Sequence, residues 1–272
     1  MIFLLFMLVF PIIYTVWLSF HRWFASSIKE PQFVGLFNYI TALSDKRFLL
    51  GILRMLYYTG GSVIIETILG LIVALLLNKE FRGRGLIRTL ILLPMVATPV
   101  AISLVWLMLY DPACGVFGWF LQQIGLPSIE WVNDPKFVIP SLILVDVWMW
   151  TPLIALIGLA GLSSLPKDPY ESAKIDGANS WQVFWFITLP LLRPTLMVAL
   201  LFRTIDALKW FDTIWVITKG GPGFSSETLN IYIYKTAFEY LNMGYSSALL
   251  VMFFSIILAI SLMLTKARRK QW

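Results

Sequence analysis

The chain has 272 residues, of which 59% are hydrophobic and 13% charged, and its formal net charge is +6. An ordinary soluble domain is about 45–50% apolar and about 25% charged. A soluble fold of this length cannot hide such an apolar excess from water, so the composition excludes soluble and disordered proteins and indicates an integral membrane protein. One cysteine and one histidine also exclude an internal disulfide and leave no Cys/His cluster for a metal.

Six apolar runs follow one another along the chain, and each is long enough to cross a bilayer, which takes about 20 residues as a helix. The first run lacks the basic start and the cleavage site of a signal peptide. The runs are continuously apolar, whereas the strands of a membrane β-barrel alternate between apolar and polar residues. The sequence therefore predicts an all-α polytopic membrane protein, one domain over residues 1–272, with helices over Met1–Phe20, Leu49–Leu77, Leu86–Tyr110, Phe137–Leu162, Leu189–Thr213 and Ser246–Thr265.

The charges between these runs orient the predicted bundle. Three segments at one end, residues 78–88, 163–193 and 266–272, hold 11 basic and 4 acidic residues, whereas the segments at the other end hold 7 of each. An excess of Lys and Arg marks the cytoplasmic side. Both termini are therefore expected in the cytoplasm, and the basic net charge reflects topology rather than nucleic-acid binding.

The inner segment 163–188 carries helix start and stop signals. Asp168 suits an N-cap, Pro169 suits the first helical position, and Glu171 can complete a capping box. Gly177 is suited to end this short helix in a left-handed conformation. A second helical piece is expected from Ser180 toward the fifth run. On these features alone, a well-capped loop is as good an interpretation as a functional element.

The same segment resembles the EAA loop of ABC importer permeases. It reads Glu171-Ser-Ala173, then Asp176-Gly-Ala178, with Ser172 in place of the first alanine of the family pattern, and a Leu-Pro-x-x-x-Pro stretch follows. The resemblance implies that residues 168–178 dock onto a separate cytoplasmic ATPase and pass its movement to the helices. The coupling residues that it implies are Tyr170, Glu171, Ser172, Ala173, Asp176, Gly177 and Ala178.

Three further stretches resemble the carbohydrate-uptake branch of that family. They are Val216–Gly223 with its Gly-Gly-Pro turn, Tyr232–Phe238, and Val34–Tyr39. Together with the loop they extend the resemblance from about Val34 to Lys270. The Gly-Gly-Pro stretch is by itself also an ordinary turn signal.

Ionisable residues inside the apolar runs are the candidates for a transport path, because such groups are costly in lipid and usually face a bundle interior or an aqueous cavity. Arg203, Asp206, Ala207 and Trp210 fall on one helical face. Arg203 and Asp206 can pair there, and a charged pair beside an indole suits a sugar. Structural ion pairing is the competing interpretation. The resemblance places the path at Trp150, Thr151, Arg203, Asp206, Ala207 and Trp210.

Two more carboxylates lie in the runs. For Glu66 a hydrogen bond between helices is the favoured interpretation, and for Asp146 a transport role and a structural role are equally open. Both residues, or Asp206, could instead serve as proton carriers in an ion-coupled secondary transporter. That alternative leaves the EAA-like loop unexplained, and no inverted repeat is evident. An intramembrane enzyme is disfavoured because His21 and Cys114 lie on different outer segments.

The resemblance implies a permease subunit of an ATP-driven, binding-protein-dependent sugar importer in a bacterial or archaeal plasma membrane. It would form half of the translocation path and assemble with a second homologous permease, a cytoplasmic ATPase dimer and an extracytoplasmic binding protein. The sequence holds no G-x-x-x-x-G-K-[ST] motif. ATP and Mg²⁺ are therefore expected in the partner ATPase, and this chain is expected to be no enzyme and to carry no catalytic residue, metal or cofactor.

Overall fold

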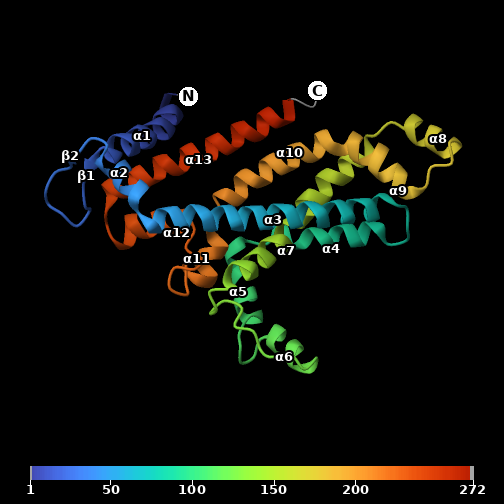
Figure 1. Cartoon of the computed structure of the whole chain (residues 1–272), viewed down its shortest axis with the longest axis horizontal. Helices are drawn as coiled ribbons and strands as arrows, with labels where there is room; N and C mark the ends of the chain where they lie inside the picture. The colour runs from blue at the N-terminus through green and yellow to red at the C-terminus, as the bar shows by residue number, and fades with distance from the viewer. Residues whose placement is uncertain (1, 270–272) are drawn as a thin grey trace.

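Long helices run side by side along the longest axis of the molecule (Figure 1). The computed structural model describes residues 2–269. Within them, four continuous helices are long and apolar enough to cross a membrane. They are α3 (Lys46–Asn78), α7 (Val138–Ser163), the helix Ser180–Leu208, and α13 (Met243–Arg269). The predicted second, fourth and sixth runs are thus confirmed as helices, while the count of six spans and the position of the termini stay predictions.

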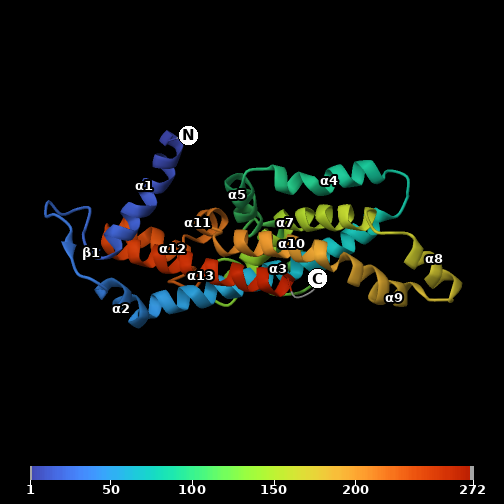
Figure 2. The same ribbon diagram turned by 90° about the horizontal axis from the view of Figure 1, so that it is seen from above.

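The first apolar run forms α1 (Ile2–Ser19), which is shorter than the four long helices. It packs against α13, and its N-terminal part projects away from the bundle (Figure 2). Many of its large apolar side chains are exposed, as expected for a helix that meets lipid or another subunit.

The third apolar run is broken. It forms α4 (Arg84–Val96) and α5 (Pro99–Leu109), whose axes differ by 96°. The predicted continuous helix over Leu86–Tyr110 is therefore wrong, while α4 and α5 together are long and apolar enough for one bent span. Ala97 and Thr98 are extended, because a proline disfavours the helical conformation in the residue before it, and Pro99 then begins the next helix.

The fifth run also ends earlier than predicted. Helix α10 (Leu189–Leu208) stops before the link 209–211, and α11 (Asp212–Thr218) begins a new direction. The side chain of Asn230 donates a hydrogen bond to the carbonyl of Lys209 at 2.7 Å, which satisfies an acceptor that the helix end leaves free. The predicted helix to Thr213 is thus wrong, and Trp210 lies outside α10.

Shorter elements gather mainly at the end of the bundle opposite the Lys/Arg-rich segments. A two-stranded antiparallel hairpin pairs His21 with Phe33. The strands of this hairpin are β1 (His21–Arg22) and β2 (Gln32–Phe33), and the same end holds α2 (Phe37–Ser44), α12 (Leu229–Tyr234) and the π-helix η2 (Lys235–Glu239). Helix α6 (Val116–Gln123) lies to one side of the middle of the bundle (Figure 1).

Small residues set the approach of α3 and α7, the central pair of the bundle. A Cβ atom on Gly70 would lie 2.7 Å from the Cβ and Cγ2 atoms of Ile154, and one on Gly158 would lie 3.1 Å from the Cβ of Ala74. Close packing at small residues is what stabilises helix pairs in lipid, where no hydrophobic force acts between them. Gly70 therefore fixes the distance between the two helices that frame the interior.

Replacing Gly70 by alanine should destabilise the protein, because the new methyl group overlaps Ile154 and overpacking costs about 1–3 kcal/mol. Gly60 is the matched control on the same helix, since a Cβ there meets nothing within 4 Å. Gly60→Ala should be neutral or slightly stabilising, because alanine is the better helix former. Thermal unfolding of the full chain in detergent tests this, and equal midpoints for the two variants would contradict the packing argument.

Candidate functional site

A buried ion cluster joins three of the long helices. Arg203 of α10 donates from Nε to Glu66 Oε2 at 2.7 Å and from Nη2 to Glu66 Oε1 at 2.9 Å. Nη2 also donates to Asp146 Oδ2 of α7. All three side chains are fully buried. The bidentate geometry is the strongest form of an arginine–carboxylate contact, so one guanidinium ties α10 to both α3 and α7.

The expected pair between Arg203 and Asp206 does not form. Asp206 lies 2.9 Å from Lys209 Nζ instead, and both of those side chains are about half exposed. Arg203 points into the bundle, where two carboxylates are available. The interhelical hydrogen bond favoured for Glu66 is present in the structure, and Asp146 shares the same partner.

Further polar atoms surround this cluster. Ser62 lies on α3 one turn before Glu66 and Tyr58 two turns before it, on the same helical face, and both are buried. Their hydroxyl groups, Arg203 Nη1 and Asp146 Oδ1 have no protein partner among the described residues. Buried polar groups normally find hydrogen-bond partners, so this face of α3 offers more hydrogen-bonding capacity than the ion cluster uses.

Two tryptophans extend the site from the ion cluster. The guanidinium of Arg203 lies 5.4 Å from the ring centroid of Trp150, and the Trp150 and Trp210 rings meet edge to face at 5.5 Å. The indole Nε1 atoms of both tryptophans and the hydroxyl of Thr151 are buried without a partner among the described residues. Aromatic surfaces beside free hydrogen-bond donors suit a ligand with C–H faces and hydroxyl groups.

The structure therefore brings together Trp150, Arg203 and Trp210 of the predicted path residues. Ala207 is buried one turn beyond Arg203, whereas Asp206 pairs with Lys209 near the surface. Glu66 and Asp146 are the neighbours of Arg203 that the predicted path omitted. The sequence does hold a signal for these two carboxylates. An ionisable group is costly in lipid, so three such groups in apolar runs are expected to contact one another.

The inner segment forms two short helices at one extreme of the molecule (Figure 1). Helix α8 (Asp168–Ile175) is followed by Gly177, whose φ of +74° confirms the predicted left-handed stop. The predicted capping box at Asp168 is wrong, because Lys167 holds the N-cap position without a side-chain hydrogen bond. Asp168 and Glu171 lie in the first turn, where their charges favour the helix dipole.

A capping box occurs instead at the second piece, which begins at Ser180 as predicted. Asn179 Oδ1 accepts from the Gln182 amide at 2.9 Å, and Gln182 Oε1 accepts from the Asn179 amide at 2.8 Å. Helix α9 (Ser180–Val183) then continues through the π-helix η1 (Phe184–Thr188) into α10. The second piece and the membrane helix are thus one unbroken helix.

The predicted coupling residues divide between two faces of the segment. Ala173 is buried, and the Tyr170 hydroxyl donates to Thr188 Oγ1 of η1 at 3.2 Å. The exposed members are Glu171, Ser172, Asp176 and Gly177, and Ala178 is half-buried. Ile175 is 87% exposed. An exposed apolar side chain among polar ones is typical of a surface that another protein covers.

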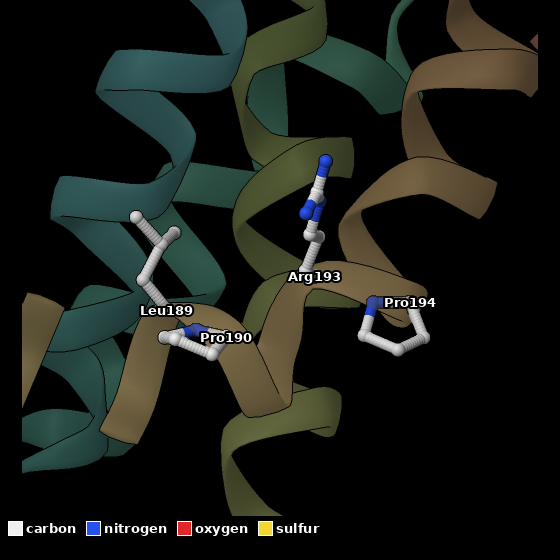
Figure 3. Close-up of a pocket in the computed structure, with 4 residues that line it drawn as sticks. All are labelled: Leu189, Pro190, Arg193 and Pro194. Atoms are coloured by element: carbon white, nitrogen blue, oxygen red, sulfur yellow. The ribbon is translucent and has the colours of Figure 1, made fainter. Parts of the chain in front are cut away.

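The start of α10 has an irregular backbone. Pro190 lacks the N–H that a regular α-helix would use there, and a π-helical turn precedes it. A hollow of about 440 Å³ opens at this turn between Leu189, Pro190, Arg193 and Pro194 (Figure 3). The two prolines remove backbone N–H donors from the helix that links the inner segment to the bundle.

A second ion cluster closes the opposite end. Arg47 donates from Nε and Nη2 to the two oxygens of Glu227 at 3.0 and 2.8 Å, and Lys235 Nζ lies 3.4 Å from Glu227. Asp45 accepts hydrogen bonds from the hydroxyls of Tyr232 and Tyr245. Burial opposes ionisation of Asp45, but these hydrogen bonds outweigh it and lower its pKa. The part of the chain that follows the Gly-Gly-Pro turn is thereby held against the start of α3.

Comparison with known proteins gives consistent similarities in sequence. The family described as binding-protein-dependent transport system inner membrane component matches residues 66–270. The trehalose/maltose transport system permease protein MalF of Thermococcus litoralis is 38% identical over 96% of this chain and 88% of its own length. The trehalose transport system permease protein SugA of Mycobacterium tuberculosis is 34% identical over 94% of this chain and 82% of its own length.

The fold has close counterparts among solved structures. A chain of a bacterial ABC transporter involved in the import of the acidic polysaccharide alginate superposes with a TM-score of 0.85, at 24% identity, over 99% of this chain and 92% of that one. A second structure of the alginate transporter, in complex with an alginate pentasaccharide-bound periplasmic protein, superposes with a TM-score of 0.79 at 24% identity, over 87% and 83%. At this identity the likeness concerns the fold.

Replacing Arg203 by methionine should destabilise the chain strongly, because it leaves two carboxylates buried without their cation. Breaking a buried pair in this way costs about 3–5 kcal/mol. Lys209→Met is the matched control on the neighbouring turn, where the exposed pair contributes about 0–1 kcal/mol. Unfolding of the full chain in detergent measures both, and an Arg203→Met variant as stable as Lys209→Met would contradict the structural role of the cluster.

Proposed function

The chain belongs to the family of binding-protein-dependent transport system inner membrane components, and we propose that it is one of two permease subunits of an ATP-driven sugar importer. It is a multi-pass integral membrane protein of the cell membrane. The observation that carries the sugar assignment is the similarity, over nearly the full chain, to a permease named for trehalose and maltose. We infer a bacterial or archaeal plasma membrane, because the relatives compared come from such organisms.

The proposed assembly contains a second homologous permease, a cytoplasmic ATPase dimer and an extracytoplasmic binding protein. The family description supports the binding protein, and the absence of a P-loop motif in the sequence supports separate ATPase chains that hold ATP and Mg²⁺. The permease itself would be a single domain over residues 1–272 that carries out no bond chemistry.

The proposed substrate path runs along α7 and α10 beside the ion cluster. Trp150 and Trp210 would offer indole surfaces to the sugar ring, and their Nε1 atoms with the Thr151 hydroxyl would hydrogen-bond its hydroxyl groups. Glu66 and Asp146 hold the Arg203 side chain in place beside Trp150. In this arrangement the ion cluster positions the side chains that line the path and does not carry protons through it.

The proposed coupling route is mechanical. Tyr170 links α8 to η1 through Thr188, and the helix from Ser180 to Leu208 is continuous. A displacement of α8 by the ATPase would therefore move the same helix that carries Arg203. Alternating access then follows if ATP binding and release favour different positions of this helix.

Gly177→Pro should uncouple transport from ATP hydrolysis, because proline cannot adopt the positive φ at the turn after α8. Gly125→Pro is the matched control: Gly125 also has a positive φ (+76°) and an open surrounding, but lies in an outer segment. Glu171→Ala should act in the same direction as Gly177→Pro. In the reconstituted complex, sugar uptake per ATP hydrolysed should fall at least tenfold in both inner variants, and unchanged coupling in both would refute the coupling role.

Trp210→Leu should slow ATP-driven uptake about two- to tenfold, since an aromatic contact contributes about 0.5–1.5 kcal/mol beyond its buried area. Trp148→Leu is the control, because Trp148 lies on α7 as Trp150 does, but it is 44% exposed and packs against Trp106. Uptake of labelled trehalose or maltose by the reconstituted complex provides the measurement. Equal rates for the two variants would place the sugar path elsewhere.

A further inference from the structure

A hollow of about 530 Å³ lies between the coupling segment and the ends of two membrane helices. The ends of α3 and α7 contribute to its lining, together with α8 and η1. Its lining contains apolar residues, which we call the floor, and polar residues, which we call the rim. The floor is made by Leu75, Leu162, Leu165 and Pro166, and the rim by Asn78, Ser163, Lys167, Tyr170, Glu171, Lys174 and Thr188.

The rim holds two lysines that form no ion pair with any described residue. Lys167 and Lys174 are both exposed, and the ion pairs of residues 2–269 do not include them. Lys167 is the N-cap of α8, where a positive charge opposes the helix dipole. Its position therefore does not stabilise α8. Glu171 is the one acidic residue of the rim, so the hollow keeps an excess of positive charge.

Exposed apolar side chains of α3 lie next to the floor in the sequence. Leu75 is half-buried, and its neighbours Ile72 and Leu76 on α3 are 48% and 57% exposed. The hollow lies at the Lys/Arg-rich end, which the charge distribution identifies as the cytoplasmic side. An apolar wall that faces acyl chains below a cationic rim is the arrangement that binds anionic lipid headgroups at the cytoplasmic side.

We propose that this hollow binds an anionic phospholipid of the inner leaflet, with its phosphate between Lys167 and Lys174 and its glycerol and upper acyl chains on the leucine floor. Asn78 and Ser163 supply further hydrogen-bonding groups at headgroup depth. A soluble phosphate compound shares the charge but cannot use the apolar floor, so the site selects the lipid.

Such a lipid would brace α8 from its membrane side. The floor and rim contact the face of α8 that carries Tyr170, whereas Ile175 is exposed. This consequence rests on the proposed function: if α8 transmits the movement of an ATPase, the lipid sets how firmly it is joined to α3 and α7. Lipid binding itself depends only on this chain.

Lipid binding is tested on the purified full chain without partners. Phosphatidylglycerol retained on the chain is measured by native mass spectrometry, with phosphatidylcholine as the neutral lipid. The double variant Lys167→Gln/Lys174→Gln should weaken phosphatidylglycerol binding roughly 30-fold, since each lysine near the surface contributes roughly fivefold. Arg82→Gln/Lys266→Gln removes the same charge from exposed inner positions outside the hollow and should change binding less than twofold.

A second variant tests the space of the hollow independently of its two lysine charges. Ser163→Trp leaves both lysines in place but fills the space, and it should also weaken phosphatidylglycerol binding at least tenfold. Equal binding in the lysine variant and its charge-matched control would overturn the proposal. Competition by glycerol 3-phosphate or inorganic phosphate at millimolar concentration would overturn it in favour of a soluble anion. If lipid binding behaves as stated while Gly177→Pro leaves coupling intact, only the proposed coupling role is refuted.

Discussion

One guanidinium between two carboxylates is the constraint on which the interior depends. Arg203, Glu66 and Asp146 are each costly in a bilayer, at least about 2.5–3.5 kcal/mol on insertion scales, and each lowers that cost only by meeting the others. Because they lie on α10, α3 and α7, their contact fixes how these helices are rotated about their axes. That rotation turns Trp150 toward the guanidinium and brings Trp210, in the link after α10, against Trp150.

The two ends of the bundle are organised by different means. At the end predicted to lie outside the cell, Glu227 is buried beneath Arg47 and Lys235, so the part of the chain that follows the Gly-Gly-Pro turn is fixed to the start of α3. At the inner end, α8 is held chiefly by Tyr170 and Ala173 and otherwise stands exposed. A rigid outer end and a lightly attached inner segment suit a subunit that receives motion from one side. The helix from Ser180 to Leu208 connects that segment directly to Arg203.

Local signals in the sequence were enough for three of the long membrane helices and for the end of the short helix in the inner segment, but not for the break between α4 and α5. Apolar length predicted α3, α7 and α13, and Gly177 marked the end of α8 correctly. The partners of Arg203 could not be predicted by helical periodicity, because they lie 57 and 137 residues away in the chain. The end of α10 at Leu208 was missed for the same reason, since the group that caps it is the side chain of Asn230. At both sites, hydrogen bonds between residues far apart in the sequence determine the structure, and the local sequence pattern does not.

In the proposed mechanism, ATP hydrolysis by the partner subunits is transmitted through the inner segment and drives sugar through this chain. The most direct measurement is uptake of labelled trehalose or maltose into vesicles that contain the complete complex and its binding protein, with ATP and the proton gradient varied independently. We expect uptake that requires ATP and persists when the proton gradient is collapsed. Uptake that follows the proton gradient and continues without ATP would contradict the account, and would assign Glu66, Asp146 or Asp206 the role of proton carrier instead.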